Sequence, residues 1–149
     1  DVEEAVMAKK FEYQKTIRER HLDLFGHVNN ATYLDLYEEA RWEFITANGF
    51  GVEQIKERQV GPVVLEADIQ FKAEITNREV ITIHSQFQEM KNSLVMVIDQ
   101  WMTKGDGKTA SRARFTAGLM DLQKRKLIKP TQDWFRAIGV ESGDLEDSR

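Results

Sequence analysis

Residues 63–75 read VVLEADIQFKAEI, a run in which apolar and polar side chains alternate. Successive side chains of a β-strand point to opposite faces, so a period of two residues predicts a strand with one apolar and one polar face. We expect this long strand to place its apolar face against a core. That face would hold Val63, Leu65, Ala67, Ile69, Phe71, Ala73 and Ile75.

Three more segments with strand-like composition follow this run. The first two are separated by Lys91-Asn92-Ser93 and the last two by Gly105-Asp106-Gly107, both of which favour tight turns. Connections this short join antiparallel neighbours, so we expect an antiparallel sheet. The predicted strands cover Val80–Glu89, Leu94–Thr103 and Lys108–Leu122.

The sequence before the alternating run predicts a strand over Phe11–Arg20 and then a long helix over residues 30–48. Asn29 or Asn30 suits the N-cap of this helix, and Gly49 suits its end. At about 100° per residue the apolar positions of the helix share one arc, which must face a core. They are Tyr33, Leu36, Tyr37, Ala40, Phe44 and Ala47.

Two short helices complete the predicted elements, over Val52–Arg58 and over Thr131–Ile138, with Thr131 as the cap of the second. The order is then one strand, one long helix and four strands, which is typical of the α+β class with an antiparallel sheet. Trp42 lies nearly opposite the centre of the apolar arc, so the long helix needs cover on a second side. A sheet wrapped around this helix would cover it but leave its own edges unpaired. We therefore expect a homodimer at least, and a homotetramer as the assembly.

The composition predicts a single domain. The chain has 149 residues, a net charge of −4 and no cysteine. These values argue against a broad nucleic-acid surface, disulfides and thiolate chemistry.

No apolar run approaches the roughly 20 residues that span a bilayer, and the acidic start does not resemble a signal peptide. We expect no membrane contact, a cytoplasmic location, a domain over 11–140, a flexible lead over 1–10 and a flexible tail over 141–149.

A motif lies between the first strand and the long helix, in residues 23–33, DLFGHVNNATY. Its pattern, D-x-x-G-H-V-N-N-x-x-Y, resembles the hot-dog thioesterases of the 4-hydroxybenzoyl-CoA thioesterase and long-chain acyl-CoA thioesterase type. The resemblance continues into Tyr37-Glu38-Glu39-Ala40-Arg41 and covers roughly Phe11 to Leu127. It implies the hot-dog fold, in which an antiparallel sheet wraps around one long central helix. It also implies hydrolysis of acyl-CoA thioesters to free acid and CoA, without metal or organic cofactor.

Thioester hydrolysis needs a base or nucleophile beside the carbonyl carbon and hydrogen-bond donors for the developing oxyanion. A carboxylate placed just before a helix can supply the first, and the free N–H groups of the helix N-terminus can supply the second. The resemblance implies that Asp23 is the base or nucleophile and that the backbone amide near Asn30 polarises the carbonyl. His27 would orient the substrate, donate to its carbonyl or hydrogen-bond Asp23.

The predicted substrate-binding residues come from three parts of the sequence. The loop contributes Phe25, Gly26 and Asn29, and Gly26 also suits the backbone geometry of the loop. The helix contributes Tyr33 and Tyr37 as walls of an apolar acyl tunnel. The alternating strand contributes Val64, Glu66 and Asp68.

Other interpretations of the same residues remain open. Glu39 is an alternative base on the helix, and His21, Asp23 and His27 contain metal-binding groups, although we expect no metal site because no further ligand pair supports one. The motif also resembles plant acyl-ACP thioesterases, D-x-N-x-H-V-N-N, with Phe25 in place of the internal Asn. Carrier-protein thioesters are therefore an alternative substrate, and a non-catalytic acyl-thioester binding protein is an alternative function. A hot-dog hydratase is a further alternative, but its motif has Asp and His five residues apart. Asp23 and His27 are four residues apart, so the sequence fits this alternative less well.

Overall fold

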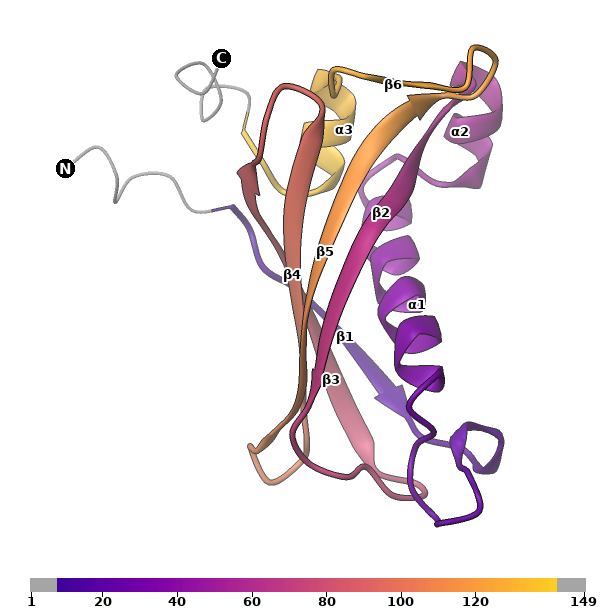
Figure 1. Ribbon diagram of the computed structural model, residues 1–149, viewed down its shortest axis with the longest axis vertical. Coiled ribbons are helices and arrows are strands. Elements are labelled where there is room, and N and C mark those ends of the chain that lie inside the picture. Colours follow the sequence, from indigo (N-terminus) through magenta and orange to yellow (C-terminus); the bar gives the residue numbers. More distant parts are fainter. Residues whose placement is uncertain (1–7, 142–149) are drawn as a thin grey trace, which may run out of the picture.

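The computed structural model describes residues 8–141. Its regular elements follow the predicted order, with one long helix between the first and second strands (Figure 1). They are β1 (Phe11–Thr16), η2 (Glu19–His21), α1 (Thr32–Ala47), α2 (Val52–Arg58), β2 (Val60–Phe71), β3 (Val80–Met90), β4 (Val95–Thr103), β5 (Thr109–Asp121), β6 (Lys126–Ile128) and α3 (Gln132–Ala137).

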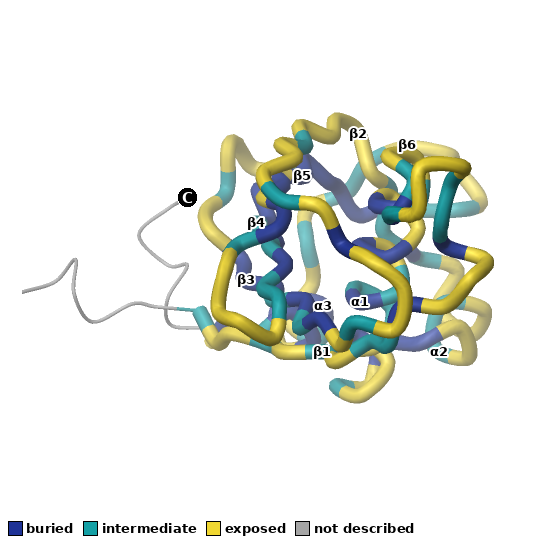
Figure 2. The backbone as a smooth tube through the Cα atoms, turned by 90° about the horizontal axis from the view of Figure 1, so that it is seen from below, coloured by how far each residue is buried: buried dark blue, intermediate teal, exposed yellow. Residues whose placement is uncertain are grey.

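The strands form one antiparallel sheet in the order β1-β3-β4-β5-β2, and β6 adds to β5. Seen from below, the strands run in an arc from β2 to β1 around α1 (Figure 2). The predicted fold class, an antiparallel sheet around one long helix, is therefore confirmed.

The core consists of two clusters along α1. Tyr33, Leu36 and Tyr37 belong to the cluster nearer the start of the helix, together with Ile81 and Phe115 of the sheet. Tyr37 is fully buried, and its hydroxyl donates to the Oγ atom of Ser111 at 2.7 Å. The predicted apolar arc of the helix thus faces the sheet over its first half.

The second core cluster surrounds the end of α1 and is closed by α3. Phe44 and Ile45 of α1 pack here with Trp134 and Phe135 of α3. The side chain of Thr131 accepts the backbone N–H of Trp134, which confirms Thr131 as the cap of α3. Burial of two aromatic side chains makes this short helix part of the core.

Strand β2 lies at an edge of the sheet, where it pairs with β5 on one side. No other strand among residues 8–141 pairs with its second side. The pairing register shifts between Val64 and Glu66, so Leu65 is a bulge residue that interrupts the predicted alternation. The prediction that this apolar face packs wholly on a core is wrong for the single chain, because Leu65 is 47% exposed and Phe71 is 55% exposed.

Several predicted boundaries differ from the structure. β1 ends at Thr16 rather than Arg20, because the turn η2 follows. β6 was not expected. The N-cap of α1 is Ala31, which makes no side-chain hydrogen bond, so the predicted caps Asn29 and Asn30 are wrong.

The predicted ends of the domain fall mostly outside the described residues, since 1–7 and 142–149 are not described. Within residues 8–141 no helix is both long enough and apolar enough to cross a membrane. The predicted cytoplasmic location stays a prediction.

Candidate active site

The motif forms a small hairpin before α1. Leu22 and Val28 form a bridge, and the backbone N–H of Asp23 donates to the carbonyl of His27 at 3.0 Å. The turn closes when the N–H of Gly26 donates to the carbonyl of Asp23. Gly26 has φ +86°, a conformation that costs a residue with a Cβ atom about 1–2 kcal/mol. The expected backbone role of Gly26 is therefore confirmed.

This hairpin is fixed to the segment that follows β2. The N–H of Val28 donates to the carbonyl of Ile75 at 2.8 Å, and His27 forms a bridge with Thr76. The N–H of Asn29 donates to the carbonyl of His21. As a result, the loop before α1 and the β2–β3 connection meet at the lower end of the molecule in Figure 1.

The carboxylate of Asp23 is half-buried and has two different oxygens. Oδ1 accepts the N–H of Phe25 at 2.8 Å, which is the turn-capping role of a loop carboxylate. Oδ2 makes no hydrogen bond to any residue in the described range 8–141. One oxygen thus holds the loop while the other is available for chemistry.

The backbone amide of Asn30, just before α1, is also free. The amides of Ala31 and Thr32 are engaged by Asn29, through its side-chain oxygen at 3.4 Å and its carbonyl at 2.9 Å. The N–H of Asn30 has no partner among the described residues. A free N–H at the positive end of a helix suits a developing negative charge.

Asp23 and Asn30 line one cavity of about 530 Å³. Phe25, His27 and Tyr33, three of the other predicted residues, also line it. His27 stacks on Phe25, and its Nε2 atom lies 3.9 Å from the Glu74 carboxylate. The structure therefore brings together most of the motif residues, while Gly26 and Asn29 shape the loop beside them.

The motif itself does not indicate the far side of this cavity. It consists of the end of β2 and the residues after it: Phe71, Lys72, Ala73 and Glu74. In the alternating pattern Lys72 and Glu74 belonged to the outward face. Only the contact of the motif with Ile75 and Thr76 places them opposite Asp23.

Four predicted substrate-binding residues lie away from the Asp23 cavity in the single chain. Tyr37 is fully buried, and Val64 lines a different cavity beside the middle of α1. Glu66 is exposed, and its Oε1 atom lies 3.9 Å from the Nζ atom of Lys91. The remaining one is Asp68.

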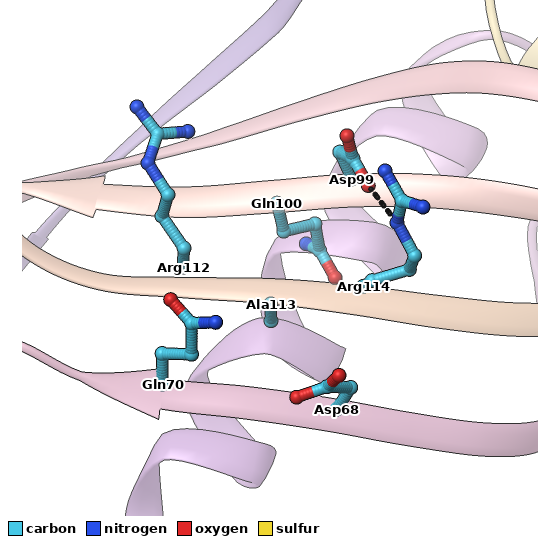
Figure 3. A pocket seen from close by; sticks show the side chains of 7 residues that line it. All are labelled: Asp68, Gln70, Asp99, Gln100, Arg112, Ala113 and Arg114. Atoms are coloured by element: carbon cyan, nitrogen blue, oxygen red, sulfur yellow. Dashed lines mark hydrogen bonds and ion pairs between the residues drawn. The ribbon is translucent and has the colours of Figure 1, made fainter.

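Asp68 lies on the outer face of the sheet, away from α1. Its partner in register is Arg114, whose Nε atom donates to Asp99 at 3.1 Å (Figure 3). The neighbouring Gln100 points the other way and donates to the carbonyl of Tyr37 on α1. Because side chains alternate along a strand, Asp68 and the Asp23 cavity are on opposite sides of the sheet.

Glu39, the alternative base, does not line the Asp23 cavity and is hydrogen-bonded to β1 instead. Its carboxylate accepts hydrogen bonds from the hydroxyl of Tyr13 and from Nζ of Lys15, the latter at 2.7 Å. Burial raises the pKa of Glu39, but these hydrogen bonds outweigh that effect and hold it below its usual range. Burial and the nearby Glu39 raise the pKa of Tyr13 to about 12. This carboxylate ties β1 to α1.

A metal site has no support in the geometry. Within residues 8–141 no group of three or more carboxylates and imidazoles is placed to hold an ion. His21 is buried, and its Nδ1 atom accepts the N–H of Arg18 at 2.8 Å. Burial and nearby cations lower the pKa of His21.

Comparison with known proteins identifies the family of the chain. A family model described as the thioesterase-like superfamily matches residues 17–138. The chain belongs to this superfamily. It is similar to the long-chain acyl-CoA thioesterase FadM of Escherichia coli (strain K12), with 30% identity over 116 residues that span 77% of this chain and 86% of FadM.

Two solved structures illustrate the likeness in three dimensions. YbaW, a probable thioesterase from Escherichia coli, has 26% identity and a TM-score of 0.76, covering 86% of this chain and 98% of YbaW. SAV2348 from Staphylococcus aureus, solved in complex with CoA, has 16% identity and a TM-score of 0.80. The match covers 89% of this chain and 83% of SAV2348. The family membership confirms the predicted hot-dog fold and the predicted enzyme class, a thioester hydrolase.

Proposed function

We propose that this thioesterase-like protein hydrolyses acyl-CoA thioesters to free acid and CoA at the Asp23 cavity. The observation that carries the proposal is the meeting of Asp23 and the free amide of Asn30 in one cavity. The first offers an oxygen without a hydrogen-bond partner among residues 8–141, and the second offers a donor at the head of a helix. Hydrolysis of an acyl carbonyl needs both.

The reaction adds water across the thioester. The Asp23 carboxylate takes a proton from water as water attacks the carbonyl carbon, or it attacks directly and water then cleaves the resulting anhydride. The N–H of Asn30 stabilises the oxyanion in either route. The C–S bond breaks, the thiolate takes a proton, and acid and CoA leave.

The other cavity residues suit substrate positioning. Tyr33 and Phe71 meet edge to face, with ring centres 5.0 Å apart, and provide an apolar wall for the acyl group. Lys72 adds a cation that suits a phosphate of CoA. Acyl-CoA as the substrate is supported by the likeness to FadM, which is named for long-chain acyl-CoA.

We also propose a homodimer at least, with a homotetramer as the assembly. The long free edge of β2 is the support, because unpaired backbone groups and the exposed side chains of Val64, Leu65 and Phe71 lie along it. Phe71 ends this edge and also lines the Asp23 cavity. A partner on β2 would therefore cover the side of the site.

The test follows thiol release from butanoyl-, dodecanoyl-, hexadecanoyl- and benzoyl-CoA, with the wild type and Asp23→Asn. We expect turnover to fall by roughly two to four orders of magnitude in Asp23→Asn. Glu57→Gln, an exposed carboxylate-to-amide change on α2, is the matched control and should keep full activity. Turnover that persists in Asp23→Asn would move the base elsewhere, and no turnover across the panel would point to carrier-protein thioesters or to a binding role.

A further inference from the structure

A second cavity, of about 220 Å³, lies beside the middle and end of α1. Most of its lining is apolar and comes from α1, the start of β2, the sheet and α3. The apolar residues include Trp42, Ile45, Pro62, Val64, Ile98 and Trp134. Two charged residues, Glu38 and Arg41, complete it. Such a cavity suits a hydrocarbon chain with a polar group at one end.

The Arg41 guanidinium is half-buried and has mostly neutral partners. One nitrogen donates to the Oε1 atom of Gln100 at 2.9 Å, and the group lies 4.3 Å from the ring centre of Phe115. No carboxylate within residues 8–141 forms an ion pair with it. Glu38, one turn earlier, is exposed and acts on it at longer range. A guanidinium has five N–H donors, so most are left for another partner.

The charge of Arg41 persists in this environment. Burial lowers its pKa to about 10, partly offset by Glu38, so the group is still cationic near neutral pH. Partial burial of a cation without an ion-pair partner is unfavourable, and an anionic ligand would relieve that cost.

The position of Arg41 relates it to the Asp23 cavity. Asn30 and Arg41 are 11 residues apart in the chain, and a helix rises about 1.5 Å per residue, which gives roughly 16 Å. Both cavities take lining from α1 and β2, the first at Tyr33 and Phe71 and the second at Arg41 and Val64. An extended acyl chain with its carbonyl at the head of α1 would place its distal end near Arg41.

We infer that Arg41 binds a carboxylate at the distal end of the acyl group, so the preferred substrates are CoA monothioesters of dicarboxylic acids. This inference rests on the proposed function, because it takes the Asp23 cavity as the place of the thioester. The carboxylate binds Arg41 through paired, charge-assisted hydrogen bonds. A chain ending in a methyl group leaves the cation without a partner.

The test compares dodecanedioyl-CoA with dodecanoyl-CoA in the wild type, Arg41→Gln and Arg41→Lys. We expect the wild type to prefer the dicarboxylic substrate in kcat/KM by about ten- to a hundredfold. Arg41→Gln should lose this preference and Arg41→Lys should retain part of it, since Lys keeps the charge without the planar fork. Arg114→Gln, on the exposed outer face, is the matched control and should behave as the wild type.

Butanoyl-CoA is too short to reach Arg41, so its turnover reports on folding and on the Asp23 cavity alone. An Arg41→Gln enzyme that loses turnover of all three substrates equally would show a structural role and overturn the inference. Equal kcat/KM for both dodecanoyl substrates in the wild type would overturn it too. If no CoA ester is hydrolysed, the proposed function is wrong. Calorimetry then tests carboxylate binding at Arg41 separately: dodecanedioate should bind the wild type more tightly than Arg41→Gln, and equal binding would overturn the inference.

Discussion

The Oδ1 atom of Asp23 accepts the backbone N–H of Phe25 at 2.8 Å, so the carboxylate proposed for catalysis also shapes its own loop. Asparagine keeps an oxygen at this position, whereas alanine removes it. We expect Asp23→Asn and Asp23→Ala to lose activity alike. Only Asp23→Ala should lose about 0.5–1.5 kcal/mol of unfolding free energy, the usual value of such a hydrogen bond. Urea denaturation of both variants measures this difference, and equal stability of the two would argue against the turn-capping role.

Gly26→Ala should lower activity because it strains the backbone at a positive φ, and not because the added methyl group clashes with a neighbour. A Cβ atom at Gly26 would meet nothing within 4 Å, yet φ is +86°. The expected cost is about 1–2 kcal/mol, which weakens the turn between Asp23 and His27. Gly26→Asn should be milder, because Asn tolerates this conformation.

Gly105→Ala provides the control for that experiment. Gly105 also has open space around its Cβ position, but its φ is not positive. Comparing kcat/KM and thermal midpoints of the three variants separates strain from a general effect of adding a methyl group. Full activity in Gly26→Ala would mean that the loop adapts without harm to the site.

Glu39→Gln should show a stability difference that depends on pH. The folded pKa of Glu39 lies below its ordinary value of 4.5, because hydrogen bonds from Lys15 and Tyr13 outweigh the effect of burial. The carboxylate therefore stabilises the fold above pH 4.5, and this contribution disappears as the pH falls through the lower folded pKa. Wild type should exceed Glu39→Gln in stability near neutrality and match it in acid, as measured by urea titration.

The same Glu39 variant also tests the assignment of the base. Because Glu39 does not line the Asp23 cavity, Glu39→Gln should keep its turnover of acyl-CoA near neutral pH. Glu57→Gln serves again as the control for both measurements. A loss of turnover as large as that of Asp23→Asn would restore Glu39 as a candidate base.

Leu65→Glu should weaken self-association. Leu65 is a bulge residue of the β2 edge and is 47% exposed in the single chain, so a buried charge there would oppose pairing of two copies. Val80→Glu introduces the same charge at a position that is 49% exposed on β3, away from β2. Light scattering after size exclusion should show smaller particles for Leu65→Glu alone. An unchanged mass for both variants would exclude the β2 edge as the interface.

The long helix and most strands could be predicted because their signals are local. Apolar spacing fixes the buried face of α1 through Tyr33, Leu36 and Tyr37, and the turns at 91–93 and 105–107 define the hairpins. The motif residues Asp23, His27 and Asn30 meet in space because they are neighbours in the chain. Periodicity and turn chemistry are enough for such features.

The features that were missed depend on distant parts of the chain. Phe71 and Glu74 join the site only because the β2–β3 connection reaches the motif, and no local pattern indicates that contact. The bulge at Leu65 and the edge position of β2 are set by pairing with β5. The helix starts at Thr32 rather than beside Asn29 because the side chain of Asn29 is used in the turn before it.

Helix α3 follows every strand in the chain, and this order has a consequence for protein synthesis. The sheet and the Asp23 loop are synthesised before Trp134 and Phe135, yet Phe50 and Phe87 gain their edge-to-face partners only when these two aromatic residues follow. A released chain that ends before residue 134 would contain every strand of the sheet but would expose the apolar residues that α3 covers. Such chains should be held by chaperones and degraded rather than released as enzymes that merely lack a surface helix.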